Sequence, residues 1–138
     1  MDSIDNRFSL TPHSGPNLKS LLGRAEGMQT AAQNLIFSNT ETIPGMTITQ
    51  SLGVVTGSTV RAKNVFKDIG AAFKNMAGGE IKAYTELLQE SRNEALFRML
   101  NDAAARGANA VVNVRFATSS VAGGAAELLA YGTAVVAQ

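Results

Sequence analysis

The chain has 138 residues, of which 45% are hydrophobic and 17% are charged, and its formal net charge of +1 comes from basic residues scattered along the sequence. This length predicts one folded domain, and the scattered charge disfavours a surface for DNA or RNA. Cysteine is absent, which excludes disulfides, thiolate nucleophiles, iron–sulfur clusters and thiolate-rich zinc sites.

The first 34 residues are predicted to form an extension that is flexible or contains a short helix. The opening stretch MDSIDNRFSL lacks the apolar region of a signal peptide, and no apolar run approaches the roughly 18 residues of a membrane-spanning helix. Apolar residues between positions 17 and 34 recur at steps of three and four, although Gly23 and Gly27 interrupt them. We therefore expect a cytoplasmic protein without a membrane span, whose folded domain covers residues 35–138.

The first part of that domain, residues 35–60, is rich in Thr, Ile and Val, which favours β-strands. Pro44 and Gly45 stand where a turn between two strands requires them. Gly53 and Gly57 interrupt the second strand and indicate a bulge or a close backbone neighbour.

Two helices are predicted next. Residues 64–76 have helical spacing, with Asn64 as an N-cap and Asp68 near the positive end of the helix dipole. Residues 80–106 form the longest apolar stripe, with Glu94–Arg98 and Asp102–Arg106 as i,i+4 ion pairs on the wet side. Gly107 is expected to end this helix in a left-handed cap.

The last third of the chain predicts two further strands. Val112, Val114 and Phe116 alternate with Val111, Asn113 and Arg115. Gly123-Gly124 permits a turn, and AELLAYGTAVVAQ follows as a largely apolar strand. The order β-β-α-α-β-β gives an α+β fold with a small antiparallel or mixed sheet, one short helix and one long helix. Since one chain has few elements to cover both sheet faces, we expect partner subunits to cover part of them.

The sequence resembles the YbjQ family, also called UPF0145 and described as heavy-metal-binding, from about Leu35 to Ala137. The matching positions lie in every predicted element of the domain and are as follows: Leu52-Gly53-Val54-Val55, Gly57, Arg61, Asn64, Asp68, Gly78-Gly79-Glu80, Tyr84, Leu87-Leu88, Arg92, Gly107-Ala108-Asn109-Ala110-Val111-Val112, Arg115-Phe116, Glu127 and Tyr131-Gly132-Thr133-Ala134-Val135. The resemblance implies a small α+β subunit that assembles into a ring, a homopentamer, with no established biochemical activity.

Metal binding has little support from the residues themselves. Soft and borderline metals prefer thiolate, thioether or imidazole ligands, and the only histidine, His13, lies in the N-terminal extension. Oxygen ligands for a hard cation could come from Asp68, Glu80 and Glu127, but their spacing does not match a calcium loop. We therefore predict no metal and no cofactor, and retain metal-ion or small-ligand binding at subunit junctions as an alternative.

Catalysis is disfavoured as well. Serines such as Ser58, Ser91 and Ser119 have no histidine base within the domain, so a hydrolase triad is excluded. Carboxylate acid–base chemistry remains a second alternative if burial raises the pKa of Glu80 or Glu127.

Charged residues in the predicted strands favour structural ion pairs over a ligand site. If the last two strands form a hairpin about Val121, Arg115 falls opposite Glu127, and opposite charges across strands stabilise a sheet. Arg61 and Asp68 are expected to pair with each other or across an interface.

The segment Gly78-Gly79-Glu80 raises the question of a phosphate cradle. The glycines are adjacent and no Gly-Lys-Ser/Thr follows, so the phosphate-loop hypothesis fails. The glycines more simply supply a turn between helices, and Glu80 complements the next helix dipole. With Tyr84, they mark the corner where a pocket is expected if the ring has one.

These observations predict a non-enzymatic binding or scaffold protein that self-associates and has no nucleic-acid partner. The family resemblance implies that the assembly is a ring, a homopentamer. The candidate ligand-binding or interface residues are Arg61, Asp68, Gly78, Gly79, Glu80, Tyr84, Arg115 and Glu127.

Overall fold

A computed structural model describes residues 18–62 and 82–138. Its elements in chain order are α1 (Leu18–Gln33), β1 (Ile36–Phe37), β2 (Ile48–Arg61), α3 (Lys82–Ala105), β3 (Ala110–Val121), the 3-10 turn η1 (Ala122–Gly124) and β4 (Ala125–Ala137). The predicted helix over residues 64–76 lies outside the described residues. The α+β class is confirmed.

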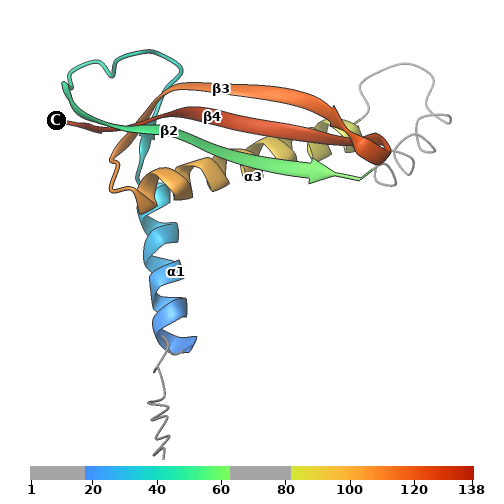
Figure 1. Ribbon diagram of the computed structural model, residues 1–138, viewed down its shortest axis with the longest axis horizontal. Coiled ribbons are helices and arrows are strands. Elements are labelled where there is room, and N and C mark those ends of the chain that lie inside the picture. Colours follow the sequence, from blue (N-terminus) through green and yellow to red (C-terminus); the bar gives the residue numbers. More distant parts are fainter. Residues whose placement is uncertain (1–17, 63–81) are drawn as a thin grey trace, which may run out of the picture.

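The four strands form one mixed sheet in the order β1-β3-β4-β2. β1 is parallel to β3, whereas β4 is antiparallel to both of its neighbours. Figure 1 shows β2, β3 and β4 side by side, with α3 along one face and α1 projecting away from the sheet.

The first two strands are present as predicted, but they are not neighbours. Gly45 has a φ of 79°, and the Met46 amide donates to the Ile43 carbonyl at 3.1 Å, so the predicted turn forms. The chain then crosses to the far edge of the sheet, because β2 pairs only with β4 and β1 only with β3.

The two glycines of β2 have the predicted roles. At Gly53 φ is 90° and the pairing with β4 shifts register between Ser51 and Gly53, which is a bulge. At Gly57 a Cβ atom would lie 2.2 Å from the Ala95 carbonyl oxygen of α3, so only glycine allows this close approach.

The long helix is amphipathic as predicted, and its buried stripe packs on the sheet. Ala95, Met99 and Ala103 are each 0% exposed. Both predicted ion pairs form, Glu94 with Arg98 and Asp102 with Arg106, and Gly107 ends the helix with a φ of 81°.

The core lies between α3 and the sheet, and a smaller cluster lies on the opposite face. The main cluster joins the α3 stripe to Val55, Val111, Val114, Ala130 and Ala134. The second cluster consists of Ile43, Ala110, Val112, Val135 and Ala137. The loop between β1 and β2 therefore covers one end of the face that lacks a helix.

The strict alternation predicted for β3 is interrupted at Asn113. Asn113 has a φ of 54°, and the pairing with β4 shifts register between Val112 and Arg115. This irregularity places both Val111 and Val114 in the main cluster. Asparagine adopts the left-handed region more readily than most residues, which suits it to this position.

Candidate functional site

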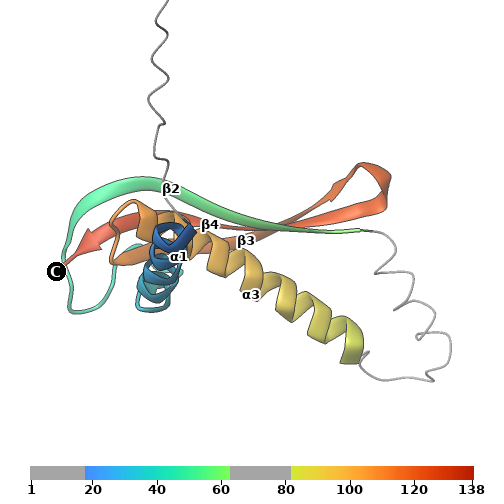
Figure 2. The same ribbon diagram turned by 90° about the horizontal axis from the view of Figure 1, so that it is seen from below.

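Figure 2 shows that α3 diverges from the sheet toward the N-terminal end of the helix. Residues at this end of the helix and on three strands line a small cleft. Its volume is about 50 Å³, enough for a few water molecules. The lining comes from β2, α3, β3 and β4, and consists of Thr59, Arg61, Leu87, Leu88, Ser91, Thr118, Ala126, Glu127 and Leu128.

Strand and helix periodicity explains why these residues meet. Side chains in a strand alternate between faces, so Thr59 and Arg61 share the α3 side with Gly57. On α3, Ser91 precedes the buried Ala95 by four residues and thus continues the stripe toward the N-terminus. The cleft is the end of the helix–sheet interface at which that stripe becomes polar.

Arg61 is the central charged group of the cleft, and its charge is already compensated. Its Nε donates to the Ser91 hydroxyl oxygen at 3.0 Å, and a terminal nitrogen donates to a Glu94 carboxylate oxygen at 3.1 Å. A Glu90 carboxylate oxygen lies 3.7 Å from the same nitrogen. An anionic ligand at Arg61 would have to displace these carboxylates.

The ion pair extends into a network that joins α3 to the end of β2. Glu94 also accepts from Arg98, and Arg98 in turn donates to the Ser58 carbonyl. This arrangement connects two strand residues to one helical carboxylate. We interpret the network as a clamp that holds the last residues of β2 against the helix.

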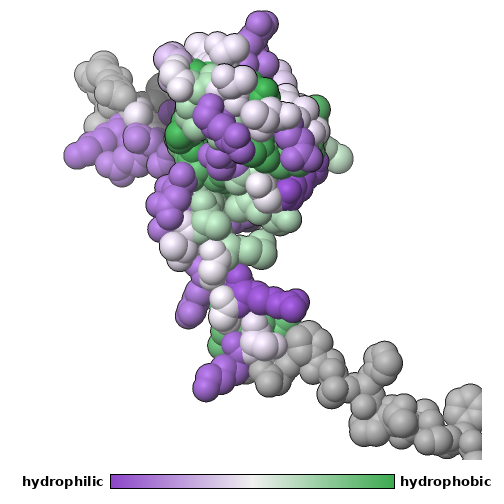
Figure 3. Space-filling view, turned by 90° about the vertical axis from the view of Figure 1, so that its left-hand side faces the viewer, coloured by the Kyte–Doolittle hydropathy of each residue, from purple (hydrophilic) through white to green (hydrophobic). Residues whose placement is uncertain are grey.

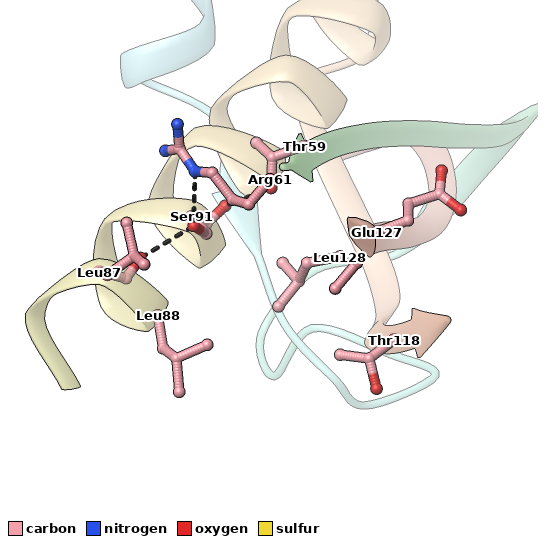
Figure 4. A pocket seen from close by; sticks show the side chains of 9 residues that line it. Thr59, Arg61, Leu87, Leu88, Ser91, Thr118, Glu127 and Leu128 are labelled. Carbon is pink, nitrogen blue, oxygen red and sulfur yellow. Dashed lines mark hydrogen bonds between the residues drawn. The ribbon is translucent and has the colours of Figure 1, made fainter. Parts of the chain in front are cut away.

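Two buried hydroxyl groups complete the cleft, and both have partners. Figure 4 shows the Ser91 hydroxyl between Arg61 and Leu87, and it donates to the Leu87 carbonyl at 2.8 Å. The Thr59 hydroxyl donates to the Ser91 carbonyl at 3.3 Å. No histidine lies in residues 18–62 or 82–138, so nothing there can activate Ser91 as the base of a triad.

The predicted pairing of Arg115 with Glu127 is wrong. In the hairpin Arg115 is opposite Tyr131, and Glu127 is opposite Ser119, which donates to it at 3.2 Å. The turn is centred on Gly123 instead of Val121, since Val121 itself pairs with Ala125. Arg115 instead donates to the Asn39 carbonyl at 3.4 Å.

The structure brings two of the predicted site residues to the cleft, but they point differently. Arg61 points toward Ser91, whereas the Glu127 carboxylate points away from them (Figure 4). Tyr84 lies in the first turn of α3 and is 37% exposed. The remaining candidates lie outside the described residues; they are Asp68, Gly78, Gly79 and Glu80.

Metal ligands do not gather in the part of the chain that the structure describes. Across residues 18–62 and 82–138, no three His, Cys, Asp or Glu side chains are placed to hold an ion. The Glu127 carboxylate, which lines the cleft, accepts from Ser119, and the Glu90 and Glu94 carboxylates face Arg61. These described residues therefore do not fit a metal centre.

A second feature, which the sequence did not reveal, is an apolar groove beside α3. It consists of two adjoining hollows of about 290 Å³ and 460 Å³ that share Phe37. The first is lined by Ala32, Gln33, Asn93, Leu96, Phe97 and Leu100, and the second by Ser38, Asn39, Val114 and Phe116.

The two edges of the sheet differ in how they are protected from pairing with a strand of another chain. The outer edge of β2 is partly capped by α3, since Arg98 donates to the Ser58 carbonyl and Arg106 to the Leu52 carbonyl at 3.3 Å. Along β3, the two-residue strand β1 pairs only with Ala110 and Val111. Strand β3 from Phe116 to Val121 therefore has no strand neighbour on that side within the described chain.

The fold and site together define a small α+β protein with a mixed four-stranded sheet, a clamped cleft and an exposed apolar groove. Residues 35–138 match the YbjQ family model, whose description is "Putative heavy-metal-binding". The chain therefore belongs to this family, as its resemblance in sequence predicted.

Curated relatives carry the name UPF0145 protein. The chain is 62% identical to one from Hahella chejuensis over 102 residues, which is 74% of this chain and 98% of the relative. It is 58% identical to one from Archaeoglobus fulgidus over 75% of this chain and 95% of that protein.

One solved structure, a protein of unknown function from Pediococcus pentosaceus assigned to the DUF74 family, is also similar. It is 17% identical, with a TM-score of 0.48 over 75% of this chain and 98% of that one. No helix in the described ranges is long and apolar enough to cross a membrane.

Proposed function

We propose that copies of this chain assemble head to tail into a closed ring, a homopentamer as the resemblance implies, which serves as a binding or scaffold protein. The observation that supports assembly is the placement of aromatic side chains. Phe37 is 48% exposed and Phe116 is 46% exposed, whereas the largest fully buried side chains are Met99, Val55, Val111 and Val135. Aromatic residues usually contribute most to a core or to an interface. Among the phenylalanines of residues 18–62 and 82–138, Phe97 packs against the main cluster, whereas Phe37 and Phe116 leave about half of their surface exposed.

The groove is a suitable surface for a second copy. Phe37 and Phe116 lie in one hollow with Val114, and the adjoining hollow carries Leu96, Phe97 and Leu100. The two hollows combine these apolar side chains with polar lining residues, Ser38, Asn39 and Asn93, and a mixture of apolar and polar groups is typical of a protein interface.

The sheet edges favour a head-to-tail arrangement over a two-fold dimer. β2 and β3 are at opposite sides of the sheet, and their protection differs. An interface made of two different surfaces is heterologous, and it gives a ring when the rotation between copies closes.

The cleft supports a role other than catalysis. Arg61 is compensated by Glu94, and the buried hydroxyl groups of Ser91 and Thr59 both donate to carbonyls. A site prepared for catalysis usually holds groups whose interactions are completed only by the substrate. Here the partners come from the chain itself.

Light scattering coupled to gel filtration tests this proposal. The wild-type protein at micromolar concentration is expected to elute as one multimer, and Phe116→Asp is expected to shift it to a smaller species, since a charge in an apolar interface is costly. Gln89→Asp adds the same charge at an exposed position on α3 and is expected to leave the mass unchanged.

Far-UV circular dichroism on each variant separates lost assembly from lost folding. Phe116 is half exposed, so the folded subunit does not depend on its burial. A monomeric wild type, or a folded Phe116→Asp variant with the wild-type mass, would overturn the proposal.

A further inference from the structure

Helix α1 projects away from the rest of the protein, and almost all of its residues are exposed to solvent. Of its residues 19–33, only Ala32 is buried, where it joins the main cluster beside α3. Leu21 is 46% exposed, Leu22 55% and Met28 44%. Figure 3 shows this helix extending from the body, with hydrophobic surface between hydrophilic side chains.

The apolar residues of α1 follow a heptad. Their spacing alternates between three and four residues, which fits positions a and d of a coiled-coil seam. The exposed seam consists of Leu21, Ala25 and Met28, and Leu18 precedes them in the sequence at the same spacing. Ala32, the next position of the heptad, packs against the main cluster of its own subunit and marks where the seam ends. Both glycines of the helix, Gly23 and Gly27, fall outside these positions.

This helix is poorly equipped to persist by itself. It has 16 residues, with no acidic residue in its first turn and no basic residue in its last turn. Isolated helices of this length are marginal in water even with good helix formers, and two interior glycines weaken it further. A packing partner along the seam would supply the missing stabilisation.

The helix also lies outside the family domain. The family match begins at residue 35, and the alignment that covers 98% of the Hahella relative spans 102 residues, 74% of this chain. The exposed leucines are thus not needed to complete the domain core, and they are available for a contact of their own.

We propose that the α1 helices of adjacent copies of this chain pack in parallel against one another in the assembly, through the seam defined above. The charges permit this pairing: Arg24, at the position flanking the seam, would face the neutral Gln29 of the other helix, so no like charges oppose each other. Lys19 and Glu26 fall on the outside of the pair.

The pairing rests on the proposed ring. Isolated helices of only two heptads associate weakly. Subunits that are held in one assembly, however, bring their α1 helices together at a high effective concentration. A rotationally symmetric ring also carries every α1 on the same side, which favours parallel neighbours.

Single introduced cysteines test the contact in the full chain, which has no cysteine of its own. Ala25→Cys lies on the seam, and Thr30→Cys is the matched control on the opposite side of the helix; both sites are exposed in the single chain. After mild oxidation with oxidised glutathione, a non-reducing gel should show at least about tenfold more linked dimer for Ala25→Cys than for Thr30→Cys, because facing seam residues reach disulfide distance. Adding Leu21→Asp and Met28→Asp to the Ala25→Cys chain should abolish the excess.

Light scattering on the same samples separates the two proposals. A multimer in which Ala25→Cys links no better than Thr30→Cys would overturn the helix contact and leave the ring intact. A monomer that shows no linkage would overturn both. If the Ala25→Cys chain still forms more linked dimer than Thr30→Cys after Leu21→Asp and Met28→Asp are added, the seam proposal is also overturned, because the contact would not depend on the seam residues.

Discussion

At the scale of single residues, Arg61 shows how a charge in a cleft can be structural. Its guanidinium contacts Ser91 and Glu94 of α3, and the same glutamate accepts from Arg98. The side chains of Arg61 and Glu94 are 27% and 35% exposed, so solvent screens the pair in part. Its energetic contribution is accordingly modest, and its main effect is to hold the end of β2 against α3.

A double-mutant cycle measures this clamp. Arg61→Gln and Glu94→Gln are each expected to lower the free energy of unfolding by about 1 kcal/mol, with a coupling of about 0.5–1 kcal/mol between them. Urea unfolding of the two single variants and the double variant provides the values. Glu90→Gln is the control, because Glu90 is 72% exposed and 3.7 Å from Arg61, and its coupling to Arg61 should be near zero. Strict additivity of Arg61→Gln and Glu94→Gln would show that the contact between these two side chains does not stabilise the fold.

At the scale of elements, the packing of α3 on β2 depends on the absence of a side chain at Gly57. The helix backbone fills the space that a Cβ atom would take, with the Ala95 carbonyl oxygen at 2.2 Å and the Met99 amide nitrogen at 2.3 Å. Both are main-chain atoms of a helix, so the contact cannot be relieved by a change of rotamer. A larger residue would force the helix and the strand apart.

Gly57→Ala is therefore expected to reduce the free energy of unfolding by about 3 kcal/mol, at the upper end of the usual cost of overpacking. Gly23→Ala is the control, since a Cβ atom there meets nothing within 4 Å. That change should be neutral or slightly stabilising because alanine is the better helix former. Denaturant unfolding at equal protein concentrations compares the free energies of unfolding of the wild type and the two variants. Equal stabilities would mean that α3 does not approach β2 as closely as described.

At the scale of the whole molecule, the distribution of large side chains is uneven. The helix–sheet core is built from alanine, valine, leucine and methionine, while Ile36, Phe37 and Phe116 lie at the surface near one edge of the sheet. A subunit built this way gains further stability if another copy covers that edge.

Thermal unfolding should consequently depend on protein concentration. If subunits dissociate as they unfold, a dilution of about a hundredfold should lower the Tm by about 5 °C. Phe116→Asp should show a lower Tm at high concentration and little change on dilution. Scanning calorimetry or circular dichroism melts at several concentrations provide the comparison. A wild-type Tm that stays constant over this range would argue against assembly.

The comparison of sequence with structure separates local from non-local features. The α3 stripe, the Pro44-Gly45 turn, the Gly107 cap and the bulge at Gly53 were all predictable. Each depends on periodicity or on the backbone preference of residues close together in the chain. The sequence also predicted that Gly57 has a bulge or a close backbone neighbour, but it could not identify that neighbour as α3.

The candidate site was only partly predictable. Arg61 was identified as a charged residue of interest, but its partners Ser91 and Glu94 lie 30 or more positions away, and only the packing of α3 on β2 brings them together. Phe37 and Phe116 gave no signal, because exposed and buried phenylalanines look alike in a sequence.

The sequence by itself determined the α+β class, the family, and the position of most helices, strands and turns, since these follow from patterns within a few residues. The tertiary structure decided which strands are neighbours, with β1 and β2 at opposite edges, and the register that places Arg115 opposite Tyr131 instead of Glu127. The reason is that hairpin register and strand order are set by turn geometry and by contacts between distant residues. In β3 and β4, several apolar alignments fit the pattern, and the glycine turn selects one of them.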